Sequence, residues 1–358
     1  MSNLKFHPLR ISDLRHETSD CVSIAFEIPE EMRSLYTFKQ GQYVTIKIEL
    51  GGQEIRRSYS ICSSPMDNEL RVAVKKVPQG VFSTYANEHL KKGEILELMP
   101  PTGKFYTELN AKNEKNYVGF ASGSGITPIM SIMKTVLQTE PNSTFTLFYG
   151  NKNAASVIFK EGIEGLKNKY LERLSVFHIL SRETNESEIL NGRIDSKKCD
   201  EFCEHFIDVN SISDFFLCGP EEMIFVVKEN LEKRGVDHKK IHFELFTSSE
   251  SKKAILGNTA DTGNNTLSEI NIKLDGKIMT FGLAKNGINI LDAALQLGAD
   301  LPYACKGGVC CTCKAKVIEG EVKMDLNYGL EEDEIENNYI LTCQSHPVSE
   351  KVVVDYDV

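Results

Sequence analysis

Four cysteines near the end of the chain have the spacing of an iron–sulfur site. Cys305, Cys310 and Cys313 form the pattern C-x4-C-x2-C, and Cys343 follows later in the sequence. A 2Fe–2S cluster needs four thiolates, and one tight loop with a distant fourth cysteine can surround both irons. Cys311 falls outside this pattern and is predicted to be a bystander thiol. Structural zinc, which favours paired C-x2-C knuckles, is the weaker alternative. The sequence therefore predicts a 2Fe–2S cluster.

Composition narrows the class of protein. The 358 residues suggest two or three domains, and 41% hydrophobic with 26% charged residues is typical of a globular protein. The net charge of −10 argues against nucleic-acid binding, and residues 265–358 carry −7 of it through 15 acidic and 8 basic residues. No apolar run reaches the ~20 residues of a membrane span, and the first residues lack the apolar core of a signal peptide. We expect a cytoplasmic protein without membrane insertion.

The remaining cysteines are scattered, which suits a reducing compartment. Cys199 and Cys203 are four positions apart and His205 is nearby, a combination compatible with a metal site. Buried thiols on one helical turn are the favoured interpretation.

Residues 1–109 consist of short alternating segments with regular turns, which predicts an antiparallel β-barrel or sandwich. Arg57 and Tyr59 face the same way because they are two residues apart on a predicted strand. One ligand could therefore meet a charge for its phosphate and a ring for stacking. Gly80 opens a predicted helix, whose first N–H groups suit a pyrophosphate. A surface arginine with a core tyrosine, and an ordinary capped helix, are the alternatives.

From Tyr117 the pattern changes to alternating strands and helices, as in a doubly wound α/β domain. One strand leads into the glycine turn at 123–128, and another leads into Cys218-Gly219-Pro220. These turns follow the carboxyl ends of strands, where open parallel sheets bind ligands. The first turn is not the G-x-G-x-x-G fingerprint, because Pro128 takes its last position. An ordinary βα turn and a buried structural cysteine are the alternatives.

The choice of coenzyme depends on Ser181, Arg182 and Glu183, just after the third strand of this domain. A 2′-phosphate needs a cation and a hydroxyl group, whereas a free ribose diol usually needs an acidic acceptor. Ser181 and Arg182 supply the first pair, and Arg193 adds a further cation. A surface ion pair between Arg182 and Glu183 is the alternative. We expect NADPH, with NADH as the second choice.

The last third of the chain is predicted to be a separate domain. Residues 247–266 are polar and poor in apolar side chains, which is the composition of a linker. Two predicted strands joined by Asp275-Gly276 indicate a hairpin. A helix at 290–297, the cysteine loop and a strand at 352–354 follow. This order resembles the α+β β-grasp fold of ferredoxins.

Three motifs resemble those of the ferredoxin–NADP reductase family: R-x-Y-S at 57–60, G-x-G-x-x-P at 123–128 and C-G-P-x-x-M at 218–223. The resemblance implies that Arg57 meets the FAD pyrophosphate, Tyr59 the flavin and Ser60 the flavin N5. The candidate FAD residues are Arg57, Tyr59, Ser60, Gly80, Ser83 and Thr84. The candidate pyridine-nucleotide residues are Gly123, Gly125, Thr127, Ser181, Arg182, Arg193, Cys218 and Gly219. The candidate catalytic residues are Ser60 at the flavin and Cys218 at the nicotinamide.

Four segments are therefore expected: an FAD-binding β-barrel at 1–109, an NAD(P)-binding α/β domain at 110–246, a linker at 247–266 and a 2Fe–2S ferredoxin domain at 267–358. NAD(P)H gives up two electrons as hydride, whereas a 2Fe–2S cluster accepts one at a time. A flavin does both, so it belongs between them. The final acceptor would be another protein.

This order of modules resembles that of reductase components of multicomponent oxygenases, above all the reductase subunits of phenylacetyl-CoA epoxidases. The resemblance implies an NAD(P)H-dependent reductase that passes electrons through FAD and a 2Fe–2S cluster to a partner oxygenase of phenylacetate degradation. One alternative is a reductase for a fatty acyl desaturase or another hydroxylase. The others are a stand-alone FAD reductase whose acidic C-terminal domain only docks a partner, and a redox sensor.

Overall fold

The computed structural model describes residues 5–185, 187–246 and 267–358. Two compact units divide the chain: one holds 7–46 and 59–246, and the other holds 1–6, 47–58 and 247–358. The predicted linker at 247–266 lies outside the described residues. In the parts of the chain that are described, no helix is long and apolar enough to cross a membrane.

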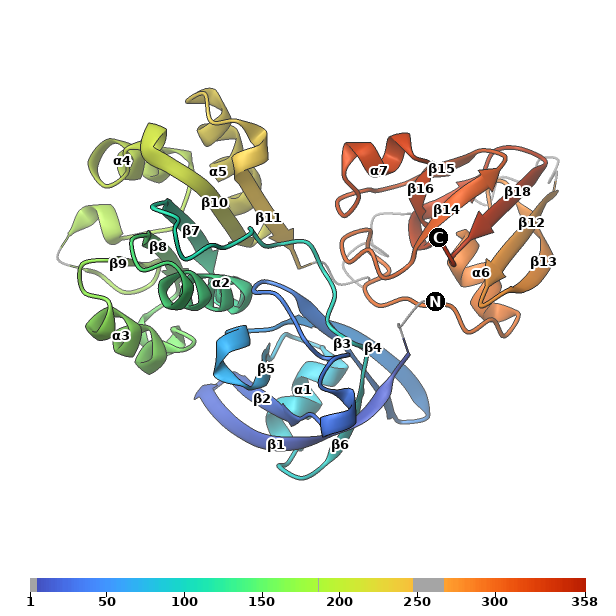
Figure 1. The fold of residues 1–358 in the computed structure, drawn as a ribbon, viewed down its shortest axis with the longest axis horizontal. Helices are drawn as coiled ribbons and strands as arrows, with labels where there is room; N and C mark the ends of the chain where they lie inside the picture. Colours follow the sequence, from blue (N-terminus) through green and yellow to red (C-terminus); the bar gives the residue numbers. More distant parts are fainter. Residues whose placement is uncertain (1–4, 186, 247–266) are drawn as a thin grey trace. The chain divides into compact units, whose positions relative to one another are not determined.

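The N-terminal sheet is a six-stranded antiparallel barrel (Figure 1). Its strand order is β4-β3-β6-β1-β2-β5, and a bridge from Ile61 to Val72 joins its two edges. The strands are β1 (His7–Thr18), β2 (Cys21–Glu27), β3 (Tyr43–Leu50), β4 (Gln53–Ser60), β5 (Leu70–Lys75) and β6 (Ile95–Leu98). Gly51 and Gly52 both have positive φ in the β3–β4 turn, as a two-residue hairpin turn requires. The helix α1 (Val81–Glu88) follows β5.

The second domain has a parallel five-stranded sheet in the order β11-β10-β7-β8-β9. The strands are β7 (Asn116–Ser122), β8 (Thr144–Asn151), β9 (Leu174–Leu180), β10 (Ile212–Gly219) and β11 (Ile241–Leu245). The helices are α2 (Ile126–Thr139), α3 (Lys160–Lys169), α4 (Ser196–His205) and α5 (Glu221–Lys233). Strand order reverses between β7 and β10, so the crevice of this fold opens where these two strands end.

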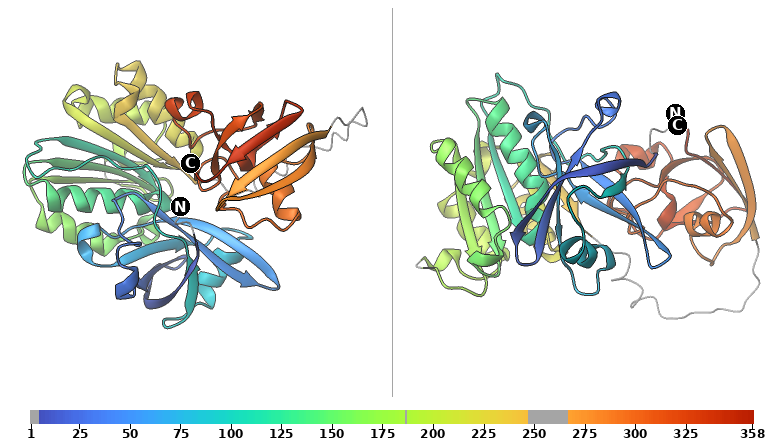
Figure 2. Two further views of the ribbon diagram at one scale, coloured as in Figure 1. Left: turned by 45° about the vertical axis from the view of Figure 1, so that its right-hand side comes forward. Right: turned by 90° about the horizontal axis from the view of Figure 1, so that it is seen from below.

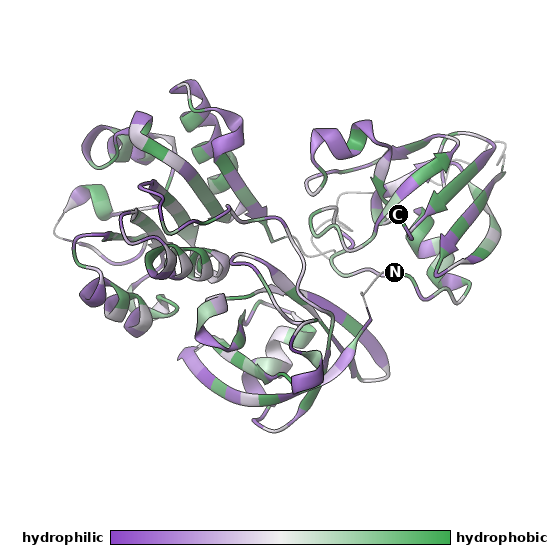
Figure 3. Cartoon of the chain, viewed as in Figure 1, coloured by the Kyte–Doolittle hydropathy of each residue, from purple (hydrophilic) through white to green (hydrophobic). Residues whose placement is uncertain are grey.

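Helices cover both faces of this sheet because successive side chains of a strand point to opposite sides (Figures 1 and 2). On one face, Phe148 of β8 stacks on Phe202 of α4 with ring centroids 4.4 Å apart. On the other face, a Cβ atom on Gly119 would come within 3.0 Å of Ile129 of α2, so glycine lets this helix approach closely. Hydrophobic residues accordingly dominate the strands, and polar residues the outer helix surfaces (Figure 3). Cys199 and Cys203 lie buried one turn apart on α4, as expected.

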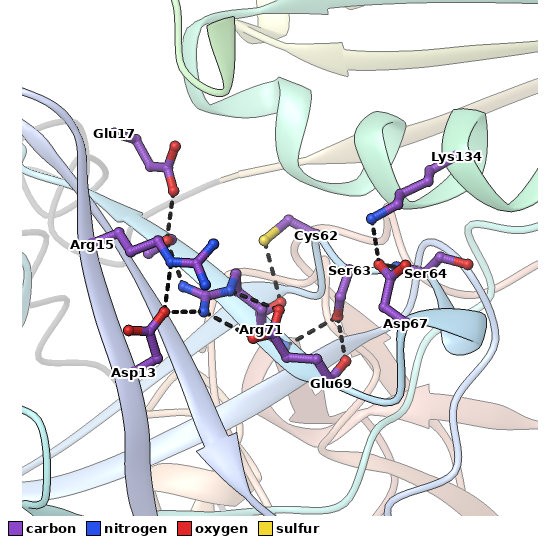
Figure 4. A network of polar contacts seen from close by, with 11 residues as sticks. Asp13, Arg15, Glu17, Cys62, Ser63, Ser64, Asp67, Glu69, Arg71 and Lys134 are labelled. Atoms are coloured by element: carbon purple, nitrogen blue, oxygen red, sulfur yellow. Dashed lines mark hydrogen bonds and ion pairs between the residues drawn. The ribbon is translucent and has the colours of Figure 1, made fainter. Parts of the chain in front are cut away.

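Polar contacts from α2 hold the barrel against the second domain within one compact unit. The Ser131 hydroxyl donates to the carbonyl of Ser63 over 2.6 Å. Lys134 pairs with Asp67 at 2.7 Å (Figure 4). The hydroxyl of Ser64 donates to Gln138 over 2.6 Å. Because the segment after β4 carries these partners, α2 fixes the end of β4 relative to the parallel sheet.

The C-terminal domain is a mixed sheet in the order β13-β12-β18-β14-β16, with a separate pair β15-β17. Its strands are β12 (Leu267–Leu274), β13 (Lys277–Ala284), β14 (Lys314–Glu319), β15 (Val322–Met324), β16 (Tyr339–Leu341), β17 (Ser345–Pro347) and β18 (Lys351–Asp355). Its helices are α6 (Ile290–Gln296) and α7 (Glu332–Glu336). Asp275 and Gly276 form the predicted turn with φ of 49° and 72°. Ile270 and Val352 share a core with Leu291 of α6.

A buried arginine braces the barrel. Arg71 is 6% exposed and reaches Asp13 at 2.5 Å, Glu69 at 2.9 Å and the Ser23 hydroxyl at 2.8 Å (Figure 4). Its hydrogen bond is the main cause that lowers the pKa of Asp13 below 3.8. This part of the stability is therefore present above about pH 4, and it is lost as Asp13 is protonated in more acidic solution.

We expect Arg71→Met to lower the free energy of unfolding by about 3 kcal/mol, because the half-buried carboxylates of Asp13 and Glu69 both lose a buried cation. Urea denaturation followed by circular dichroism at pH 7 measures this change. Arg15→Met is the matched control, because Arg15 also contacts Asp13 but has a 64% exposed side chain. Its cost should stay below about 1 kcal/mol. Equal costs for the two variants would contradict the bracing role of Arg71.

Candidate functional site

Two glycine turns, at 123–128 and 218–220, contact each other at the crevice between β7 and β10. A Cβ atom on Gly125 would lie 2.1 Å from the carbonyl oxygen of Cys218, so only glycine permits this approach. A Cβ atom on Gly219 would lie 2.8 Å from the Met223 side chain. Gly123 has a φ of 54°, and its carbonyl accepts a hydrogen bond from Tyr149 over 3.0 Å. The sequence-predicted glycines therefore come together at one point of the fold.

The N-terminus of α2 opens into the same crevice. The helix begins directly after Gly125, and no side chain caps it. Thr127 is buried in its first turn, where its hydroxyl donates to the carbonyl of Ser124 over 3.0 Å. Uncapped N–H groups at a helix start favour a phosphate group.

A carboxyl group links Ser60 to the neighbourhood of Cys218. The parallel pairing of β10 with β11 places Cys218 opposite Glu244. The Ser60 hydroxyl donates to Glu244 over 2.7 Å. From the sequence, Ser60 and Cys218 were selected separately. The family resemblance placed the segment that begins at Glu244 near the flavin edge, without connecting Glu244 to either residue. The available signal was an acidic residue between the apolar residues Phe243 and Leu245 of β11.

Burial sets the protonation of this cluster. It raises the pKa of Glu244 to about 7, against the opposing effect of the Ser60 hydrogen bond. It also raises the pKa of the fully buried Cys218 thiol well above 9.0, and Glu244 adds to that shift. Cys218 is therefore a neutral thiol near pH 7, which suits contact with a ring better than nucleophilic attack. Glu244 can take up or release a proton in the same range.

The candidate FAD residues lie on β4 and at the start of α1. Arg57 and Tyr59 are both half-buried, and the ring of Tyr59 lies 5.5 Å from that of Phe82. The guanidinium of Arg57 donates to the carbonyl of Arg56 over 2.8 Å. A strand thus presents a cation and a ring two residues apart, as expected.

The turn before α1 is closed by its own side chains. Ser83 is buried, and its hydroxyl donates to the carbonyl of Gly80 and accepts from the N–H of Val77, both over 3.2 Å. A Cβ atom on Gly80 would lie 2.4 Å from that hydroxyl. Thr84 is half-buried, and its N–H donates to Gly80 over 2.9 Å. Ser83 therefore shapes this turn.

The candidate coenzyme residues Ser181 and Arg182 are exposed just beyond β9. The N–H of Ser181 donates to Asn151 over 3.0 Å, and that of Arg182 donates to Lys152 over 2.8 Å. Glu183 is engaged elsewhere, because its carboxylate accepts the N–H of Ala154 over 2.8 Å. Among the described residues, no ion pair joins Arg182 to Glu183. The alternative interpretation, a surface ion pair between Arg182 and Glu183, is therefore wrong.

Arg193 comes from a second segment that runs beside the end of β9. Leu180 forms a parallel bridge with Asn191, and the N–H of Gly192 donates to Leu180 over 2.8 Å. Arg193 is exposed and follows directly. Two exposed guanidinium groups thus belong to adjoining segments.

The four candidate cluster cysteines form two pairs in the C-terminal domain. The thiols of Cys305 and Cys310 hydrogen-bond to each other, as do those of Cys313 and Cys343. The first hydrogen bond, with help from backbone N–H groups, lowers the pKa of Cys305 to about 6. Within the described ranges, no group of three or more His, Cys, Asp or Glu residues is arranged so that it could hold one metal ion. Two pairs of thiols fit two iron ions that each take two cysteines.

Cys311 does not join these pairs. It has a φ of 52°, and its thiol donates to the carbonyl of Gly329 over 2.8 Å. The backbone N–H of Gly307 instead points to the sulfur of Cys305 over 3.3 Å. N–H groups directed at sulfur are a recurrent feature of iron–sulfur sites.

Three family models match the chain in sequence order. An oxidoreductase FAD-binding domain matches residues 8–106, an oxidoreductase NAD-binding domain matches 120–229, and a 2Fe–2S iron–sulfur cluster binding domain matches 272–348. The residues of the barrel, the crevice and the cysteine pairs fall within or next to these ranges.

Known proteins resemble the chain over its whole length. One component of the 1,2-phenylacetyl-CoA epoxidase of Escherichia coli (strain K12) is 42% identical over 98% of both chains. The ferredoxin reductase component of the 3-ketosteroid-9-alpha-monooxygenase of Mycobacterium tuberculosis is 32% identical over 98% of this chain and 95% of its own. The structure of phthalate dioxygenase reductase shares the fold, with a TM-score of 0.59 at 21% identity over 98% of both chains.

The Ser60–Glu244 contact predicts a carboxyl group that titrates near neutral pH. Isotope-edited infrared spectroscopy should show a protonated carboxyl band that disappears as the pH rises through about 7. The band should be absent in Glu244→Gln. In Ser60→Ala it should persist to higher pH, because the hydrogen bond that lowers the pKa of Glu244 is lost. A band that disappears below pH 5 in the unsubstituted protein would contradict the role of burial.

Proposed function

The chain belongs to the family of oxygenase reductase components that combine FAD-binding, NAD-binding and 2Fe–2S domains, and on this basis we propose that its acceptor is the oxygenase of a phenylacetyl-CoA epoxidase. As a member, it is an oxidoreductase that delivers electrons to an oxygenase. The identity of 42% to a component of such an epoxidase supports the choice of acceptor. The ketosteroid monooxygenase reductases, at 32% or lower, support the second candidate, a steroid hydroxylase.

One observation carries the electron-transfer part of the proposal: the four cysteines lie in the segment that matches a 2Fe–2S cluster binding domain, where backbone N–H groups point to the sulfurs of Cys305 and Cys310. In the proposal, Cys305 and Cys310 hold one iron, and Cys313 and Cys343 hold the other. A bound flavin supplies the conversion between two-electron hydride chemistry and one-electron transfer.

The proposed cofactor roles rest on the resemblance to the reductase family, and the contacts of the crevice are compatible with them. The residues proposed to hold FAD are Arg57, Tyr59, Ser60, Gly80, Ser83 and Thr84. The residues proposed to hold the pyridine nucleotide are Gly123, Gly125, Thr127, Ser181, Arg182, Arg193, Cys218 and Gly219. Ser60 would lie at the flavin, and its hydroxyl donates to Glu244, whose pKa of about 7 would let that carboxyl group hold or release a proton there. Cys218 presents a small neutral side chain to the nicotinamide.

We also infer NADPH as the coenzyme. Support comes from the hydroxyl of Ser181 and the two exposed guanidinium groups of Arg182 and Arg193, which can bind a 2′-phosphate. The carboxylate of Glu183, which would repel that phosphate, is engaged with Ala154.

The division of the chain into domains at 1–109, 110–246 and 267–358 with a linker at 247–266 is part of the proposal, and the matched ranges support it. A cytoplasmic location is also part of the proposal, because all ten cysteines are free thiols, as is usual in reducing compartments.

Coenzyme choice can be tested at Arg182. We expect Arg182→Ala to raise the KM for NADPH by about 10- to 100-fold, the equivalent of about 1.5–3 kcal/mol for a charge-assisted hydrogen bond. The KM for NADH should change by less than about twofold. Steady-state kinetics with ferricyanide as acceptor measure both values. Lys233→Ala, which removes an exposed cation from α5, is the control. An equal loss with both coenzymes would refute the phosphate contact.

Reconstitution tests the acceptor. The protein, NADPH, phenylacetyl-CoA and the purified oxygenase subunits of a phenylacetyl-CoA epoxidase should yield the epoxide. Cys343→Ser should abolish product while ferricyanide reduction continues, because ferricyanide can take electrons from the flavin. Cys311→Ser, the matched thiol control, should remain active in both assays. Activity only with a ketosteroid hydroxylase or a desaturase would overturn the proposed acceptor, and absence of NAD(P)H turnover would favour a redox sensor.

A further inference from the structure

One buried amide connects the two chain segments that carry the cysteine pairs. Gln344 follows the fourth candidate ligand and is 9% exposed. We propose that Gln344 is a positioning residue, which ties the loop at 305–313 to Cys343 and raises the reduction potential of the cluster by hydrogen-bonding to a ligand sulfur. This inference rests on the proposed binding of a 2Fe–2S cluster.

The side-chain NH2 group of Gln344 shares its two hydrogens among three acceptors. Its Nε2 atom donates to the carbonyl of Lys306 over 3.0 Å and to that of Cys343 over 2.8 Å. It also lies 3.5 Å from the sulfur of Cys343. Carbonyl oxygens only accept hydrogen bonds, so the amide must turn its nitrogen toward them. The orientation that reaches the sulfur is therefore set by the two backbone partners.

The loop that Gln344 reaches depends on such support. Lys306 has a φ of 49°, a left-handed conformation that is rarely stable in a residue with a side chain. Gly308 has a φ of 77°, and a Cβ atom there would lie 3.2 Å from Cγ of Gln344. The hydrogen bond to Lys306 thus holds a residue of unfavourable backbone conformation directly beside Cys305.

The main chain of Gln344 is fixed as well. Its carbonyl accepts the N–H of Asp325 over 2.9 Å, and it ends the short turn Thr342–Gln344. Hydrogen bonds therefore hold both the main chain and the amide of Gln344, which keeps the amide beside the sulfur of Cys343. The contact between the Gln344 amide and the Cys343 sulfur therefore belongs to the folded structure of the domain.

Reduction adds one negative charge to the cluster and its thiolates. A hydrogen-bond donor near a ligand sulfur stabilises the more negative, reduced form, so it raises the reduction potential. Without this donor, electrons would leave the cluster more readily but would enter it less readily. Gln344 therefore adjusts the reduction potential of the cluster relative to the potentials of its electron donor and its electron acceptor.

The test is a redox titration of the full-length, cofactor-containing protein, followed by electron paramagnetic resonance and visible absorption. Gln344→Met fills similar space without a donor. At a fixed potential, it should lower the ratio of reduced to oxidised cluster by up to about tenfold, equal to about 59 mV for one electron. Gln344→Glu should lower this ratio further, because a carboxylate repels the reduced cluster.

Gln296→Glu is the matched control for charge. It makes the same change at an exposed position of the same domain and should leave the potential unaltered. If the Gln344→Glu variant fails to bind the cluster, the reduction potential of the Gln344→Met variant tests the inference. An unchanged potential in Gln344→Met would overturn the inference, as would faster loss of the cluster without a change in potential. Absence of the 2Fe–2S spectrum from the unsubstituted protein would instead contradict the proposed function.

Discussion

The hydrogen bond from Ser60 to Glu244 joins the last residue of a barrel strand to a strand of the parallel sheet. It forms only if the two domains keep one fixed arrangement, and the polar contacts of α2 with Ser63, Ser64 and Asp67 provide it. Because α2 also starts at the Gly125 turn, one helix fixes this glycine turn and the end of β4 relative to each other. Hydride transfer needs this kind of precision, since the rate falls steeply when reacting atoms are misplaced.

Desolvation gives the crevice its chemical character. A half-buried carboxyl group and a fully buried thiol there have pKa values raised above their usual ranges, so near pH 7 the thiol is neutral and the carboxyl group is only partly ionised. A neutral thiol at Cys218 and a carboxyl group at Glu244 that titrates near neutrality suit proton and hydride movements. The exposed cations Arg182 and Arg193, by contrast, lie in solvent, where charge costs little and can bind an anionic ligand.

The C-terminal domain separates its structural and chemical tasks in a similar way. An apolar core that includes Ile270, Leu291 and Val352 holds the sheet, while the cysteine loop departs from regular structure. Positive φ at Lys306 and Cys311 stores conformational strain there. The loop needs hydrogen bonds from outside itself, and the amide of Gln344 and the carbonyl of Gly329 supply two of them.

The sequence alone was enough for features that depend on local order: the cysteine spacing, the glycine turns, the Asp275-Gly276 hairpin and the change from β to βα patterns. These are properties of neighbouring residues, and the periodicity of strands and helices allows them to be recognised in the sequence. It could not show that Glu244 meets Ser60, that Glu183 turns away from Arg182, or that Gln344 spans two cysteine segments. Each of these contacts joins residues through backbone conformation or strand register, which only the packed tertiary structure decides. Protonation near neutral pH follows from the same packing, because burial, and not residue type, moves the pKa of Glu244.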